Sequence, residues 1–179
     1  EWFLTGSLFC IALYHLILFF LRRQDRTPLY FCILCFVVAV RTLTSGDNYI
    51  YQIFPGLSFG LLYTLYMLTQ AAAVLFFIRY LGGLFPAEVH PLAVRWVTRI
   101  FTLIMVFIAA APLGLLSRSG IVLDVLTLVV ALYAVLILGM AIERGREGRL
   151  LVSAGVFLFF LTVIHDVLLE YGVLEGLLL

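Results

Sequence analysis

The sequence contains no lysine, and all 11 of its basic residues are arginine. Retinal proteins need a lysine for their Schiff base, and pyridoxal enzymes and P-loop nucleotide binders need one too. Charge is scarce as well: 12% of the 179 residues are charged, where a soluble domain has about 25%. The net charge of +1 gives no electrostatic footprint for nucleic acid. These absences exclude the lysine-dependent classes and argue against a nucleic-acid-binding protein.

Cysteine is also rare. Cys10, Cys32 and Cys35 are an odd number of thiols, and all three lie within apolar runs, so no disulfide framework is predicted. The spacing of Cys32 and Cys35 matches redox and zinc motifs, but no second cysteine pair or nearby histidine accompanies it. We interpret both as small apolar helix residues.

Apolar residues make up 65% of the chain. A globule of this size still needs a polar surface, so the excess indicates an integral membrane protein. Six segments approach or exceed the length of about 20 residues that crosses about 30 Å of hydrocarbon. They cover residues 4–21, 29–45, 57–81, 94–116, 121–142 and 150–172. Because backbone groups in hydrocarbon must bond internally, the prediction is an all-α, polytopic transmembrane helix bundle that forms a single domain over residues 1–179.

Polar breaks separate these spans. They are residues 22–28, 46–56, 82–91, 117–120 and 143–149. The fourth break reads Ser-Arg-Ser-Gly, and Pro112 just before it is predicted to kink the fourth span near its end.

The arginines predict the orientation. Nine belong to the first, third and fifth loops and their flanks: Arg22, Arg23, Arg26, Arg79, Arg95, Arg99, Arg144, Arg146 and Arg149. Only Arg41 and Arg118 lie on the other side, so the odd loops are predicted to be cytoplasmic and the amino end outside. Six crossings leave the carboxyl end outside, and we expect a seventh helix beyond Leu179 to return the chain to the cytoplasm.

Four short patterns accompany this topology. They are Gly6-x7-Tyr14-His15-Leu16, then Pro28-Leu29-Tyr30-Phe31, then Ser45-Gly46-x2-Tyr49-x-Tyr51-x3-Pro55, and Pro86 and Pro91 before Arg95 and Arg99. Together they resemble the membrane domain of bacterial seven-transmembrane receptors with diverse intracellular signalling modules. His15 stands where that family usually has asparagine, and Pro28-Leu29-Tyr30 matches its Tyr-Leu-Tyr-like motif only in part.

This resemblance implies a membrane-embedded sensor in the bacterial inner membrane. Such a domain relays an extracytoplasmic stimulus to a cytoplasmic kinase, cyclase or phosphatase that is not in this chain. The implied partners are the lipid bilayer, an extracytoplasmic sensor domain, a cytoplasmic output domain and a second copy in a homodimer. The fragment itself is not expected to be an enzyme.

Polar side chains within the spans are candidate site residues, because ionisable groups in hydrocarbon are costly and usually face the protein interior. The candidates for a ligand site or polar relay are Arg41, Tyr66, Asp124, His165, Asp166, Glu170 and His15. Tyr66 shares a face with Tyr63 and Gln70, and Asp124 is predicted to lie one turn inside the outer end of its span.

Two interpretations of these residues stay open. In the first they form a polar pocket open to the outside, where Arg41 pairs with Asp124 or Asp166 and His165 titrates with the external pH. In the second Arg41, Asp124 and Glu170 reach water or headgroups, and His15, expected near mid-depth, only bonds a neighbouring helix. No catalytic residue, metal or cofactor is predicted.

Two other functions are weighed. An intramembrane protease needs a nucleophile next to its base, but Ser153 and His165 lie twelve residues, or roughly 18 Å, apart on one helix. A zinc hydrolase needs a ligand cluster at one depth, which the intramembrane histidines do not provide. A small multi-pass transporter or channel subunit is the main alternative, although spans two, three, five and six lack the central Gly or Pro breaks that transporters often show.

Overall fold

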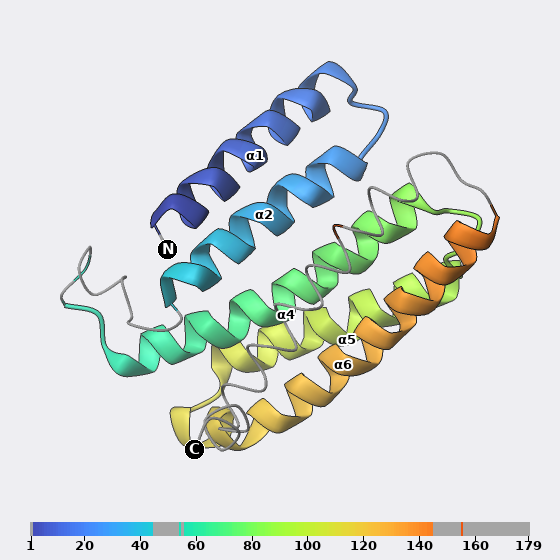
Figure 1. The fold of residues 1–179 in the computed structure, drawn as a ribbon. Helices are drawn as coiled ribbons and strands as arrows, with labels where there is room; N and C mark the ends of the chain where they lie inside the picture. Colours follow the sequence, from blue (N-terminus) through green and yellow to red (C-terminus); the bar gives the residue numbers. More distant parts are fainter. Residues whose placement is uncertain (1, 45–53, 55, 145–154, 156–179) are drawn as a thin grey trace, which may run out of the picture. The chain divides into compact units, whose positions relative to one another are not determined.

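The computed structural model describes residues 2–44, 54, 56–144 and 155. All regular structure in these residues is α-helical (Figure 1). The helices are α1 (Trp2–Leu21), α2 (Thr27–Thr44), α4 (Phe59–Leu84), α5 (Pro91–Ala110) and α6 (Leu113–Glu143). Each is long and apolar enough to cross a membrane. The prediction of an all-α, multi-pass membrane protein is therefore confirmed, while the predicted span 150–172 lies outside the described residues.

Residues 1–130 form one compact unit and residues 131–179 another, and the division falls within α6. The single domain expected over residues 1–179 stays a prediction. All contacts discussed below, apart from those within α6 itself, belong to the first unit.

The boundary between α5 and α6 differs from the predicted one. α5 ends at Ala110, where the Ala111 N–H donates to the Phe107 carbonyl. Pro112 has no N–H to donate, but its carbonyl accepts hydrogen bonds from the amides of Leu115 and Leu116 at 2.9 and 3.2 Å. Pro112 thus precedes the first turn of α6, and the predicted kink inside the fourth span is wrong.

The polar run at residues 117–120 is helical and does not form the predicted break. The Ser117 hydroxyl donates to the Gly114 carbonyl at 3.2 Å, and the Ser119 hydroxyl donates to the Leu116 carbonyl at 2.9 Å. Because the helix backbone itself satisfies these hydroxyls, a polar run remains compatible with the first turns of a helix. α6 therefore starts eight residues earlier than predicted, at Leu113 instead of residue 121.

α4 lies between its neighbours in the first unit. α1 packs on α2, α2 on α4, and α4 on α5 (Figure 1). α4 is apolar along most of its length and buries side chains on several sides, including Ile78 and Leu81, which are fully buried. Ser58 begins this helix, because its hydroxyl accepts a hydrogen bond from the Leu61 amide at 3.3 Å.

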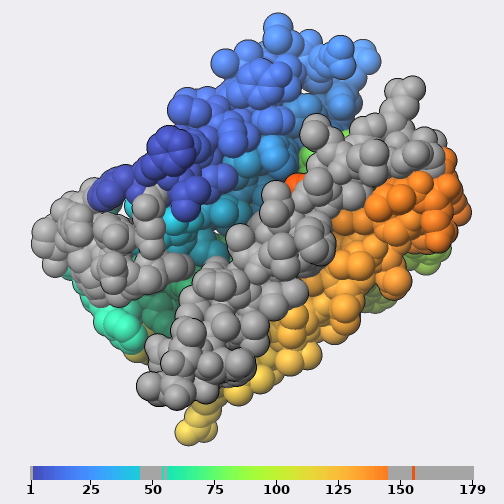
Figure 2. Space-filling model, viewed as in Figure 1, coloured from blue at the N-terminus to red at the C-terminus, as the bar shows by residue number. Residues whose placement is uncertain are grey.

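α1 has the opposite character. It contacts α2, and it lies at the surface of the view in Figure 2. Its exposed side chains are apolar, with Phe3 84% and Leu21 75% exposed. Leu13 and Ile17 are exposed on the same helix. An apolar surface of this extent is typical of a helix that faces lipid.

Two glycines bring three helices together at the Gly83 end of α4, which is predicted to be cytoplasmic. A Cβ at Gly83 would meet the Thr27 side chain of α2, within 3.2 Å of its Cβ and Cγ2 and closer still to its Oγ1. A Cβ at Gly82 would lie 3.3 Å from Val94 Cγ2 of α5. The missing side chains therefore allow the close approach of α2 and α5 to α4.

The turn between α1 and α2 is held by Asp25. Its carboxylate accepts a hydrogen bond from the Thr27 amide at 2.8 Å. The bonds from the Thr27 hydroxyl and amide lower the pKa of Asp25, and nearby Arg22 adds to this effect. The ionised carboxylate thus fixes the residue at which α2 begins.

We expect the midpoint of thermal unfolding to depend on Asp25 in acid. Because the folded-state pKa is lowered, Asp25 stabilises the fold above its unfolded-state pKa, and this stabilisation is lost as the pH falls through the lowered value. Between about pH 6 and pH 3, wild type should lose more stability than Asp25→Asn. The difference in lost stability between wild type and Asp25→Asn should be small, since the Asp25 carboxylate is largely exposed. Thr27→Val, which lacks the hydroxyl donor, should lose less stability in acid than wild type. Equal pH profiles would contradict this role.

Candidate outer polar cluster

Arg41 of α2 lies against Tyr66 of α4. Its Nη2 donates to the Tyr66 phenol oxygen at 3.0 Å, and its Nη1 donates to the Tyr66 carbonyl at 3.2 Å. The guanidinium carbon also lies 4.2 Å from the centroid of the Tyr66 ring. Two hydrogen bonds and a cation–π contact therefore join α2 to α4 at a single residue.

The backbone around this contact supplies further acceptors. The Thr69 hydroxyl donates to the same Tyr66 carbonyl at 2.8 Å, and the Thr44 hydroxyl donates to the Arg41 carbonyl at 2.9 Å. Both threonines are buried. In an apolar environment such bonds satisfy side-chain hydroxyls that water does not reach.

Gln70 of α4 bonds Asp124 of α6. Its Nε2 donates to the Asp124 Oδ1 at 2.7 Å. Asp124 is eleven residues, or roughly 16 Å, from the start of α6. Asp124 therefore lies about three turns from the start of its helix, and not one turn as predicted, because the helix starts at Leu113 and not after Gly120.

α4 and α6 run in the same direction along this contact. A Cβ at Gly60 would lie 3.4 Å from Leu113, and a Cβ at Gly120 would lie 3.0 Å from Met67 Cε and 3.7 Å from the Tyr63 hydroxyl. Gly120 is one turn before Asp124 and on the same face. The sequence interpretation missed the contact of Gly120 with α4, because it placed Gly120 in a loop. The spacing of four residues between Gly120 and Asp124 was the signal that could have predicted it.

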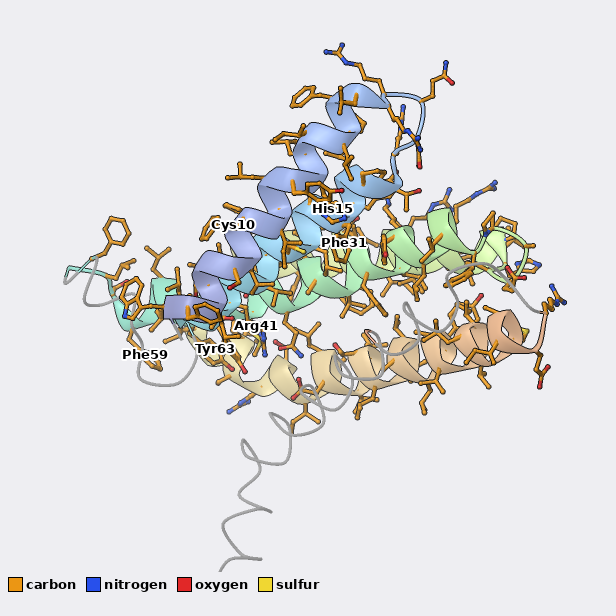
Figure 3. The ribbon with its side chains drawn as sticks, turned by 45° about the horizontal axis from the view of Figure 1, so that its top comes forward. Cys10, His15, Phe31, Arg41, Phe59 and Tyr63 are labelled. Atoms are coloured by element: carbon orange, nitrogen blue, oxygen red, sulfur yellow. The ribbon has the colours of Figure 1, made fainter. Side chains whose placement is uncertain are left out.

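We call five of these residues the outer polar cluster, after the side on which the predicted orientation places them: Arg41, Tyr63, Tyr66, Gln70 and Asp124. The rings of Tyr63 and Tyr66 stack with centroids 6.5 Å apart, and Phe59 continues the stack at 6.2 Å from Tyr63. Figure 3 shows Arg41 and Tyr63 toward the end of the helices where Phe59 lies. A cation on α2 and an anion on α6 thus bond different residues of α4.

His15 lies apart from this cluster (Figure 3). Its Nδ1 is 3.0 Å from the Ile11 carbonyl of its own helix, and its ring is 4.5 Å from Phe31 of α2, which in turn lies 4.8 Å from Tyr80 of α4. Phe31 and Arg41 are ten residues, or roughly 15 Å, apart on α2. His15 therefore contacts the neighbouring helix through its ring, and its hydrogen bond is local.

The other predicted site residues are not placed. His165, Asp166 and Glu170 lie outside the described residues. The pairing of Arg41 with Asp124 or Asp166 and the titration of His165 stay predictions. Within the described ranges, no group of three His, Cys, Asp or Glu side chains is arranged to hold a metal ion. Cys32 and Cys35 are buried with Ala12 among Leu8, Leu16 and Phe31.

Long apolar helices joined by polar side chains within their spans define a polytopic helical membrane domain. The family model described as 7TM diverse intracellular signalling matches residues 1–179, the whole chain. The chain therefore belongs to this family, and the predicted family is confirmed. Comparison with curated proteins and with solved structures gives no match.

Proposed function

We propose that this chain is the membrane-embedded sensor and signal-transducing domain of a receptor in the bacterial inner membrane. It relays an extracytoplasmic stimulus to a cytoplasmic kinase, cyclase or phosphatase. Membership of the 7TM diverse intracellular signalling family supports a signalling role in the membrane. The proposed partners are an extracytoplasmic sensor domain, the output domain and a second copy of the chain.

The observation that carries the proposal is the outer polar cluster. Arg41 of α2 and Asp124 of α6 bond different residues of α4, Tyr66 and Gln70. Hydrogen bonds between membrane helices are directional, so a small shift of α2 or α6 changes which bonds are made. A helix system with two discrete sets of such bonds has the two states that a relay needs. In the predicted orientation, the cluster lies in the half of the helices nearer the stimulus.

The Gln70–Asp124 bond provides the test. Asp124→Leu removes the acceptor, whereas Asp124→Asn keeps an acceptor oxygen and removes the charge. An interhelical bond of about 0.6–1.7 kcal/mol corresponds to a roughly threefold to twentyfold change in a two-state equilibrium. We expect Asp124→Leu to change the basal activity of the cytoplasmic output module in the full-length receptor by that factor, and Asp124→Asn to change it less.

Thr127→Val is the matched control. Its hydroxyl lies one turn along α6 and donates to the Leu123 carbonyl of the same helix at 2.8 Å, so its removal breaks no bond between helices. Output should stay at the wild-type level in this variant. Unchanged output in Asp124→Leu at wild-type protein level would contradict the relay, and stimulus-independent solute flux through the reconstituted protein would favour the transporter alternative.

A further inference from the structure

Arg79 is a half-buried cation near the Gly83 end of α4 that two other helices hold in place. Its Nε donates to the Thr98 hydroxyl of α5 at 3.4 Å. Its guanidinium carbon lies 5.6 Å from the ring centroid of Tyr30 on α2. The bond from Nε to Thr98 and the contact with the Tyr30 ring orient the guanidinium plane. Because the guanidinium is a planar fork, its two Nη groups then point away from Thr98.

No protein carboxylate neutralises this charge in the part of the chain that the structure describes. Arg79 makes no ion pair with any described residue. The two acidic side chains nearest in sequence to this end of α2 and α4 are engaged or enclosed: Asp25 accepts from Thr27, and Glu88 is only 8% exposed. A partly desolvated cation is stabilised by an anion, so the Arg79 guanidinium is suited to bind an anion from outside the described residues.

More positive charge lies beside Arg79. Arg95 precedes Thr98 by one turn of α5 on the same side, and Arg99 lies one turn after Arg95. Both arginines are exposed, and the Arg99 guanidinium lies 5.7 Å from the ring centroid of Trp96, itself 59% exposed. An exposed tryptophan beside arginines is typical of the level where lipid headgroups meet hydrocarbon.

We propose that Arg79, with Arg95 and Arg99, binds the phosphodiester of an anionic phospholipid in the leaflet predicted to face the cytoplasm. A phosphodiester presents two oxygens in the geometry that a guanidinium fork matches. Basic sites between helices on this side of a membrane are suited to such headgroups. The site is independent of the proposed signalling function.

The surface next to these arginines fits a lipid better than free phosphate. Farther along α5, toward its end at Ala110, Ile100, Leu103, Val106 and Phe107 are all exposed. This direction leads into the hydrocarbon, so acyl chains of a lipid whose phosphate contacts Arg79 have an apolar surface to cover. Inorganic phosphate gains nothing from that surface.

The test compares lipids by thermal unfolding of the full chain in detergent micelles. Phosphatidylglycerol, phosphatidylcholine and inorganic phosphate are each titrated, and the rise of the unfolding midpoint gives the apparent affinity. We expect phosphatidylglycerol to stabilise wild type more than phosphatidylcholine does, and inorganic phosphate to have no effect. One arginine near a charged membrane surface contributes about 1 kcal/mol, so Arg79→Gln should weaken phosphatidylglycerol binding roughly fivefold.

Arg23→Gln is the matched control, because it removes the same charge from an exposed residue of the same end, next to Phe20. It should weaken phosphatidylglycerol binding less than Arg79→Gln does, because it removes only the general attraction of a surface charge and no guanidinium in contact with the phosphodiester. Arg95→Gln tests the site without disturbing the contact between Arg79 and Thr98. It should also lower the affinity for phosphatidylglycerol, so the test stays decisive if Arg79→Gln does not fold. Equal affinities in all three variants would overturn the proposal, as would stabilisation by inorganic phosphate that matches that by phosphatidylglycerol.

Discussion

Gly83→Ala is expected to destabilise the protein, although a Gly→Ala change within a helix usually stabilises. The change gains about 0.5–1 kcal/mol in helix propensity. The new methyl group meets the Thr27 side chain, however, and overpacking of this kind costs about 1–3 kcal/mol. The nearest atoms belong to Thr27, the first residue of α2, and include its Cβ. Removing the overlap with this Cβ therefore requires a shift of α2 itself. The expected net result is a loss of up to about 2 kcal/mol, measured by unfolding in mixed micelles.

The control for this prediction is Gly139→Ala. A Cβ at Gly139 of α6 meets no atom of the described residues within 4 Å, so only the gain in helix propensity remains and stability should be unchanged or higher. Thr27→Ala combined with Gly83→Ala removes the Thr27 Oγ1, the closest atom. The double variant should therefore lose less free energy of unfolding than the sum of the losses in the two single variants. Additive losses would show that Gly83 and Thr27 do not meet.

Arg41→Gln is expected to change signalling strongly and stability only slightly. An arginine costs about 2.5–3.5 kcal/mol at the centre of a membrane helix and less in the last turn, where Arg41 lies. Removing this cost offsets part of the loss of the contacts to Tyr66. Those contacts, two hydrogen bonds and a cation–π contact, set how α2 is placed on α4. Coupling energies between sites of about 1–3 kcal/mol correspond to about 5–150-fold changes. In the proposed receptor, we expect the basal output to shift within that range.

Two variants separate the contact from the charge. Tyr66→Phe removes the phenol oxygen but keeps the ring and the carbonyl, so its effect should be smaller than that of Arg41→Gln. Arg118→Gln removes the same charge from an exposed residue of α6 and should leave output unchanged. An equal shift in Arg118→Gln and Arg41→Gln would mean that net charge, and not the contact with Tyr66, controls the output.

The helices were largely predictable, because length and hydropathy alone identify a membrane span. The predicted bounds of the first three spans differ from those of α1, α2 and α4 by only a few residues. The error at Pro112 has a physical cause. Polar composition was taken as the sign of a break at residues 117–120, but serine hydroxyls bond their own helix, whereas proline removes a backbone donor.

The candidate site was less predictable. Arg41 and Tyr66 were candidates because polar groups are rare within apolar spans, and the spacing of Tyr63, Tyr66 and Gln70 placed these three on one face. Which residue each one contacts depends on how the helices are rotated and shifted relative to one another, and a single apolar sequence carries no signal for this. His15 illustrates the limit, because its partner is an aromatic ring, Phe31, among many similar ones.

The register of α6 on α4 restricts the kinds of motion available to these helices. The contacts Gly60–Leu113, Met67–Gly120 and Gln70–Asp124 keep a nearly constant offset along the two chains. Sliding α6 by one helical turn, about 5.4 Å, would place Gln70 opposite Gly120 or Leu128, neither of which has an acceptor side chain, and would break its bond with Asp124. Tilting or swivelling about the Gln70–Asp124 bond keeps the bond intact. The pair therefore acts as a pivot, which opposes axial displacement while permitting angular displacement.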